Sequence, residues 1–303
     1  MKYYGELAAL LTAIAWTFNS VTFTIIGRRV GSLAVNHIRM WMALPLLCLL
    51  HLFMFGTFLP NNLDFHRILF LGLSGIIGLA IGDAFLFEAF LIIGPRLTLL
   101  IMLLAPLFSA ILAWLFLGEG LLILEIIGMA ITMTGIGWVI MGREQPSSGS
   151  ESKINSRPPR YLTGVILAVG GAIGQAVGLL FSRIGLEGGV SPISGNTIRI
   201  AAATLAMTIV SLFNKTFIRY IGKIKDRKIF WGMLAGVISG PIIGIILSLE
   251  AITHTQIGVA STLMSISPVL LIPVSHFLFK EKITLKAIIG TAISLLGIIL
   301  LFV

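Results

Sequence analysis

Three acidic residues stand out within long apolar stretches, where an ionisable side chain needs a functional or structural explanation. Asp83 lies near the middle of segment 68–92, Glu88 follows it by five positions, and Glu250 lies in a later apolar segment. Inside a bilayer, each such charge costs roughly 2.5 to 3.5 kcal/mol on insertion scales. On a helix, Asp83 and Glu88 are roughly 140° apart, so they do not face one small cavity equally. Burial disfavours a charged carboxyl, so we expect Asp83 either to exchange a proton or to pair with a base.

Two arginines and three further side chains complete the set of candidate binding or proton-coupling residues. The motif Asn36-x-Ile38-Arg39 recurs as Asn196-x-Ile198-Arg199. Each arginine either extends to the membrane interface or pairs with an acid or an anionic substrate. Indole and amide groups in lipid need partners on neighbouring helices or on a substrate. The candidate substrate-binding or proton-coupling residues are therefore Asp83, Glu88, Glu250, Trp16, Asn19, Gln175, Arg39 and Arg199.

The elements that position these residues are predicted to be membrane-spanning helices. Of the 303 residues, 57% are hydrophobic and only 11% are charged, whereas a soluble chain carries roughly 25% charged residues. A helix needs roughly 20 apolar residues to cross the hydrocarbon core. Ten such windows are present: 5–26, 36–55, 68–92, 96–117, 122–141, 161–183, 195–213, 229–252, 257–279 and 284–302. We expect an all-α integral membrane protein with ten transmembrane helices, and the first window to be retained rather than cleaved.

The ten windows form two similar halves. Glu88-Ala89 matches Glu250-Ala251, and Pro106 matches Pro268, each 162 positions later. Residues 142–160 contain prolines, serines and a glycine, as is typical of a linker between units 1–141 and 161–303. Because each half has an odd number of spans, the second half must be inverted relative to the first. Inverted repeats are how many secondary transporters build inward-open and outward-open states around a midplane site.

One proline within the fourth span of each half is a candidate gating residue. Pro106 and Pro268 each remove an intrahelical hydrogen bond, so they should bend or locally open their helices. A static kink is the alternative, since membrane helices tolerate proline. Glu119 and Glu281 close these spans and are expected to have structural roles at the membrane boundary.

These features together resemble the drug/metabolite transporter superfamily, of the EamA type with two five-helix repeats. The resemblance covers the whole chain and rests on span count, repeat length and matched local motifs. These motifs are Ala105-Pro106 and Ser267-Pro268, Leu117-Gly118-Glu119 and Phe279-Lys280-Glu281, and the glycines Gly128, Gly135, Gly290 and Gly297. Lys280 departs from the pattern of the first half, which has Gly118. The resemblance implies an exporter of a small metabolite or drug-like molecule and does not name the substrate.

The loop charges and the resemblance imply opposite orientations in the membrane. Lysines and arginines gather on the cytoplasmic side of membrane proteins. Most basic loop residues lie at one predicted end of the bundle, and only Lys2, Arg67 and Arg183 lie at the end with both termini. Charge therefore places the termini outside the cytoplasm, whereas the resemblance places them inside.

The function that fits best is secondary transport across the cell membrane by alternating access, with proton coupling through Asp83. A channel and a membrane-embedded enzyme are the alternatives; no filter-like loop and no catalytic motif is present in the sequence.

The net charge of +9 is distributed over short loops, so we expect no nucleic-acid partner. We expect a small-molecule substrate, a lipid bilayer, a homodimer as one assembly state, and no cofactor or metal. Few basic residues lie inside the predicted spans. The substrate is therefore expected to be a zwitterionic or neutral metabolite or a lipophilic cation rather than a phosphate ester, which needs basic partners.

Overall fold

The chain folds as a bundle of helices. The computed structural model describes residues 3–60, 63–117, 123–141, 160–254, 260, 263–279 and 284–301, and these contain helices and turns but no strand. The first half comprises α1 (Tyr4–Val30), α2 (Ser32–Phe55), α3 (Phe65–Ser74), η1 (Gly75–Gly82), α4 (Asp83–Ile93), α5 (Pro95–Ile101), α6 (Leu104–Leu117) and α7 (Ile123–Met141). The second comprises α8 (Tyr161–Leu186), α9 (Pro192–Phe213), α10 (Phe217–Gly222), η2 (Lys223–Lys225), α11 (Arg227–Val237), η3 (Ile238–Gly244), α12 (Ile245–His254), α14 (Ser267–Phe279) and α15 (Leu285–Leu301). Most of the predicted linker, together with Glu119 and Glu281, lies outside the described residues.

Within the described ranges, seven helical segments are long and apolar enough to cross a membrane, as expected of a multi-pass integral membrane protein. They are Tyr4–Val30, Ser32–Phe55, Phe65–Ile93, Pro95–Phe116, Tyr161–Leu186, Pro192–Phe213 and Arg227–His254. Three shorter apolar helices fall in the remaining predicted windows: Ile126–Val139, Ser267–Leu278 and Leu285–Leu300. The helical, membrane-embedded character is confirmed, and the count of ten spans stays a prediction.

The third span of each half is one long helix with a wide π-helical segment in its middle. In the first half, α3, η1 and α4 form one rod, and η1 contains three glycines. In the second, α11, η3 and α12 do the same, and Pro241 lies inside η3. Both rods begin at an aspartate cap, because Asp64 accepts from the Arg67 N–H and Asp226 accepts from the Lys228 N–H. Such caps satisfy backbone donors that the first turn leaves free.

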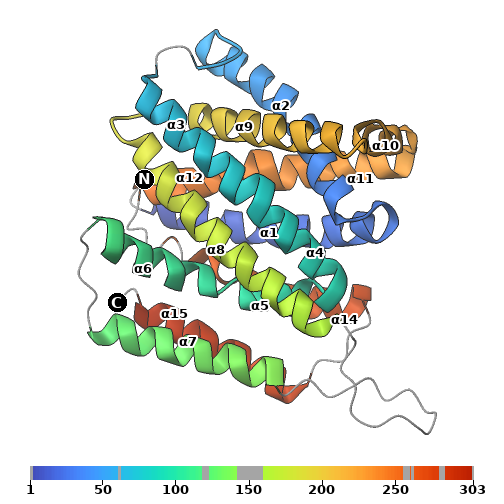
Figure 1. Ribbon diagram of the computed structural model, residues 1–303. Helices are drawn as coiled ribbons and strands as arrows, with labels where there is room; N and C mark the ends of the chain where they lie inside the picture. The colour runs from blue at the N-terminus through green and yellow to red at the C-terminus, as the bar shows by residue number, and fades with distance from the viewer. Residues whose placement is uncertain are drawn as a thin grey trace, which may run out of the picture.

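The two halves are interleaved rather than side by side. Helix α1 packs on α11, η3 and α12 of the second half, and α8 packs on α3, η1 and α4 of the first. Equivalent helices also meet, since α2 contacts α9 and α7 contacts α15, and the two fourth spans meet where α5 contacts α14. In Figure 1, α1 and α8 run in opposite directions across the bundle. Every wall of the centre is therefore built from both halves.

The contact between α7 and α15 is reciprocal. Thr132 Oγ1 donates to Ser294 O at 3.3 Å, and Ser294 Oγ donates to Thr132 O at 3.4 Å. The two residues are repeat equivalents, 162 positions apart. Close approach depends on glycine, because a methyl group on Gly135 would lie 2.7 Å from Gly290 O. Small residues allow membrane helices to pack backbone to backbone.

Two basic segments of the described chain, the end of α1 and α10, lie at the opposite end of the bundle from the N and C labels. Figure 1 shows the N and C labels at one side, and α10, which carries Arg219, at the other. Arg28 and Arg29 are in the last turn of α1, also away from the N label.

Candidate functional site

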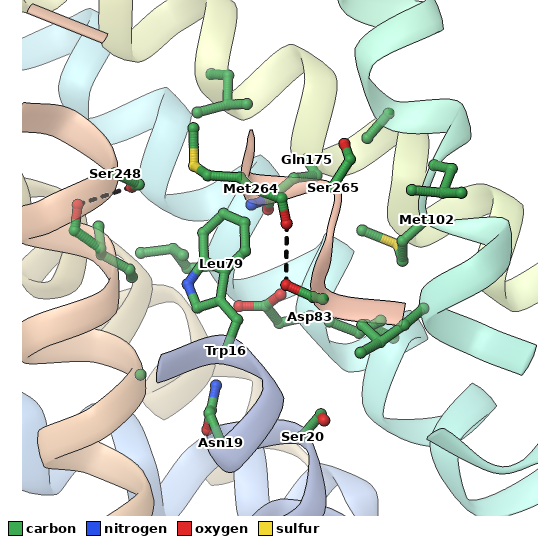
Figure 2. A pocket seen from close by; sticks show the side chains of 18 of the residues that line it. Trp16, Asn19, Ser20, Leu79, Asp83, Met102, Gln175, Ser248, Met264 and Ser265 are labelled. Atoms are coloured by element: carbon green, nitrogen blue, oxygen red, sulfur yellow. Dashed lines mark hydrogen bonds between the residues drawn. The ribbon is translucent and has the colours of Figure 1, made fainter. Parts of the chain in front are cut away.

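A cavity of about 150 Å³ lies at the centre of the bundle, between the two halves. Its walls come from α1, α2, the η1–α4 rod, α5, α6, α8, α9, the η3–α12 rod and the start of α14. Most of the lining is apolar or aromatic, including Phe87, Phe90, Leu99 and Leu103. Figure 2 shows Trp16, Asn19 and Ser20 entering the site from one helix, with Asp83 nearby. Such a cavity, with few polar groups in an apolar wall, is typical of a small-molecule site.

The cavity gathers most of the residues that the sequence singled out. Those that line it are Trp16, Asn19, Gln175, Asp83, Arg39, Arg199, Pro106 and Pro268. Residues that the sequence reading missed include Ser109, Ser248, Ser265 and Met264. Serine and methionine are common on the inner faces of membrane helices, so no sequence signal distinguished them.

Glu88 and Glu250 are not among the residues that line the cavity. Glu88 accepts a hydrogen bond from Ser32 Oγ at the start of α2. Glu250 lies 3.2 Å from His254 Nδ1 on the same helix, where both side chains are partly exposed. Phe87 and Phe90 line the cavity, so Glu88, which lies between them in the chain, is excluded because it is on another face of α4. Glu250 lies roughly 140° around its helix from Ile245, which lines the cavity. Any role for them in transport stays a prediction.

In the first half, a closed polar network surrounds Asp83. Arg39 forms an ion pair with the Asp83 carboxylate, and its Nε donates to Asn36 Oδ1 at 2.8 Å. Arg39 Nη2 also donates to Leu79 O at 3.1 Å. The guanidinium carbon lies 4.7 Å from the centre of the Phe87 ring, which adds a cation–π contact. Arg39 is only 3% exposed, so the interpretation that it extends to the membrane interface is wrong.

The π-helical segment supplies acceptors for this network. Asn36 Nδ2 donates to Leu79 O at 3.3 Å and to Ala80 O at 3.0 Å, and both carbonyls belong to η1. A π-helical turn distorts the regular ladder, and such turns are frequent at functional sites. The network therefore depends on the irregular middle of the third span.

The second half has the equivalent asparagine and arginine but not the acid. Asn196 Nδ2 donates to Pro241 O at 2.8 Å, and Pro241 is the repeat equivalent of Leu79. Ile245 occupies the place that corresponds to Asp83. Arg199 is 3% exposed, and its Nε has no hydrogen-bond partner among the described residues. It too is buried, so the interfacial interpretation is wrong for both arginines.

Glycines bring α8 against η1 and so deliver Gln175 to the cavity. A methyl group on Gly174 would lie 2.8 Å from Gly82 Cα, and one on Gly178 would lie 3.0 Å from Gly78 Cα. Only glycine permits this backbone contact. Ser74 Oγ donates to Gly178 O at 2.6 Å and fixes the register of the two helices.

Both candidate gating prolines follow a break in their span. In the first half, α5 ends at Ile101, and Ala105 N donates to Met102 O at 2.9 Å in a tighter turn. In the second, Ile266 N donates to Leu263 O at 3.2 Å just before α14. The described residues thus show a break in each span next to its proline, which lacks the N–H of a regular helix. A gating role for the two prolines stays a prediction. Ser267 Oγ donates to Ala13 O at 3.2 Å, which ties this break to α1.

Comparisons with known proteins agree with this architecture. The model of the EamA-like transporter family matches residues 3–141 and 162–303. A solved structure, described only as a crystal structure of a protein, superposes with a TM-score of 0.62. The match is 15% identical in sequence and covers 99% of this chain and 96% of that chain, so it supports the fold alone. No curated protein matches the sequence.

Proposed function

Since the chain belongs to the EamA-like transporter family, we propose that it moves a small organic solute across the cell membrane by alternating access. In this mechanism, two inverted five-helix repeats rock around one central site and open it to each side in turn. The observation that carries the proposal is the position of the cavity, because its walls come from both halves and include twin helix breaks. A change in how the halves pack would change access to it.

Export and proton coupling are further parts of the proposal. Export rests on the family resemblance. Proton coupling rests on Asp83, whose ion pair with Arg39 faces the cavity and must be weakened if the carboxylate takes up a proton. Breaking and remaking this pair would link proton uptake to the state of the site.

The proposal is tested with the purified chain in proteoliposomes. Counterflow of radiolabelled small carboxylates, amines and neutral solutes should include at least one substrate whose exchange saturates. Flux that rises in proportion to concentration would contradict a transporter and favour a channel. Chemical conversion of a solute by protein in detergent would favour an enzyme.

A pair of neighbouring substitutions tests whether the cavity is the transport site. Ser109 lines the cavity, whereas Ala110, next to it on α6, does not. Ser109→Phe should fill the cavity and reduce saturable exchange at least about tenfold, because an overfilled site excludes its ligand. Ala110→Phe adds the same ring outside the cavity and should leave exchange within about twofold. Equal effects of the two substitutions would place the site elsewhere.

A further inference from the structure

From the unequal charge pairing of the two halves, we infer that the transported solute carries a single carboxylate on a compact apolar body, and that Arg199 binds this carboxylate. The inference rests on the proposed transport function and adds the chemical class of the substrate. Its basis is a difference between repeat-equivalent residues that line the same cavity.

The two halves begin this part of the site with the same construction. Asn36 and Asn196 each donate to the third span of their own half, at the equivalent residues Leu79 and Pro241. Three residues later, each half places an arginine on the cavity wall. The two halves therefore share the asparagine bond to the third span and the position of the arginine, and they differ in the groups that pair with the arginine.

In the first half, the arginine is fully engaged. Arg39 has an amide acceptor, a backbone carbonyl and the Asp83 carboxylate. In the second half, Ile245 replaces the acid, and the bond from arginine Nε to the asparagine is also absent. Both Arg199 Nε and Asn196 Oδ1 lack a partner in the part of the chain that the structure describes.

A buried guanidinium in this state needs an anion. Arginine stays protonated in proteins, and a buried charge is costly unless it is paired. Asp83 also interacts electrostatically with Arg199, but its ion pair is with Arg39. Two arginines and one aspartate leave one positive charge in the site, which a single carboxylate balances and a doubly charged phosphate overcompensates. The earlier expectation of a lipophilic cation rested on few buried bases, and the structure buries two.

The rest of the cavity indicates the size and polarity of the part of the solute that carries the carboxylate. Its wall is largely apolar, with Phe87, Phe90 and Trp16 among the aromatic residues. Its volume of about 150 Å³ equals that of an engineered apolar cavity in another protein that holds benzene. Asn19 Oδ1 and Ser109 Oγ also lack partners among the described residues, so they are available to one further polar group. A single ring with a carboxylate fits these conditions.

Binding of benzoate, benzamide and benzylammonium to the purified full chain in lipid nanodiscs tests the inference. The probes share a ring and differ in charge, and titration calorimetry measures their affinities without transport. The wild-type chain should bind benzoate about tenfold or more tightly than benzamide, the ratio expected for a hydrogen bond to a charged group. Arg199→Gln should bring the two affinities within about threefold. Arg199→Lys keeps the charge without the bidentate geometry and should retain part of the preference.

A second pair of variants keeps Arg199 and therefore avoids the risk that its replacement unfolds the protein. Ile245→Asp supplies the missing acid, so Arg199 should pair with it as Arg39 pairs with Asp83, and the preference for benzoate should disappear. Ile245→Asn is the matched control, since it adds a polar group of the same size without charge and should keep the preference.

Two results of the binding experiments would overturn the inference: benzamide or benzylammonium binding as tightly as benzoate, or a benzoate preference that survives both Arg199→Gln and Ile245→Asp. Failure of transport is a separate outcome. Arg199-dependent benzoate binding without saturable flux would contradict the proposed transport and support the binding site. Saturable flux of benzylammonium that is unchanged in Arg199→Gln would support transport and overturn the carboxylate assignment.

Discussion

At the scale of single residues, the two acids of the third span differ in their surroundings. Asp83 faces the cavity and pairs with Arg39, whereas Glu88 receives a hydrogen bond from Ser32 and lies outside the cavity lining. Both are on one continuous span, five positions apart. We therefore expect replacement of the carboxylate by an amide to affect transport differently at Asp83 and at Glu88.

Asp83→Asn should abolish uphill transport that is driven by a pH gradient but preserve counterflow exchange. Asparagine keeps the shape and one acceptor for Arg39 but cannot take up a proton in this role. Uptake into proteoliposomes with and without an imposed pH gradient measures both activities for any solute that the wild-type chain exchanges. Glu88→Gln is the control and should keep uphill transport within a few-fold. Normal uphill transport with an unchanged pH profile in Asp83→Asn would make Asp83 structural.

The contact between Ser32 and Glu88 should stabilise the fold rather than serve transport. Ser32 is buried at the start of α2, and its hydroxyl donates to the Glu88 carboxylate. A hydrogen bond to a charged group contributes about 1.5 to 3 kcal/mol, so Ser32→Ala, which removes the donor, and Glu88→Met, which removes the carboxylate acceptor, should each lower the unfolding free energy by that order.

Denaturation of single and double variants in detergent measures this coupling. Together the two changes should cost clearly less than their sum, because they remove the same interaction. Thr22→Ala removes an exposed hydroxyl that bonds within its own helix and should change stability by about 0.5 kcal/mol or less. Additive losses for Ser32 and Glu88 would show that the bond is not formed.

At the scale of elements, glycine decides how closely the helices of the two halves approach. On α7, Gly135 faces the backbone of α15, whereas a methyl group on Gly137 would meet nothing within 4 Å. The two positions share one helix and differ only in their neighbours. Alanine substitutions at the two positions therefore separate the contribution of packing to stability from that of helix propensity.

Gly135→Ala should destabilise the bundle, and Gly137→Ala should be neutral or stabilising. Alanine favours a helix over glycine by about 0.8 to 1 kcal/mol at either site. At Gly135 the added methyl would lie 2.4 Å from Ser294 Oγ and 2.7 Å from Gly290 O, so α15 must move away and packing is lost. Thermal inactivation in detergent reports the difference between the variants. A Gly135→Ala protein as stable as Gly137→Ala would mean that α7 and α15 do not pack this tightly.

At the scale of the whole molecule, the distribution of basic residues sets an expectation for orientation. Exposed Lys225 lies at the end with α10, and exposed Glu187 lies between α8 and α9 at the end with the N label. The positive-inside tendency places the α10 end in the cytoplasm and the termini outside.

Thiol labelling of intact cells checks this orientation. Cys48 is the single cysteine, so Cys48→Ser provides a background for Glu187→Cys and Lys225→Cys. A membrane-impermeant maleimide should label Glu187→Cys in intact cells and Lys225→Cys only after permeabilisation. The reverse pattern would support the orientation that the family resemblance implies.

The sequence by itself determined the helices, the repeat and most members of the site. Apolar length predicts membrane spans because the bilayer sets one thickness, and matched motifs 162 positions apart expose the two halves. Trp16, Asn19, Gln175 and Asp83 could be chosen because polar groups inside apolar helices are costly.

Only the tertiary structure decided how these residues are grouped. Arg39 forms the ion pair with Asp83, whereas Arg199 Nε has no hydrogen-bond partner among the described residues. This difference depends on packing between helices that are far apart in sequence. Both arginines look interfacial when judged by position in a span, because burial is set by the neighbouring helices and not by the helix itself. The exclusion of Glu88 from the cavity has the same origin, since a helix predicts its faces but not which helix covers each face.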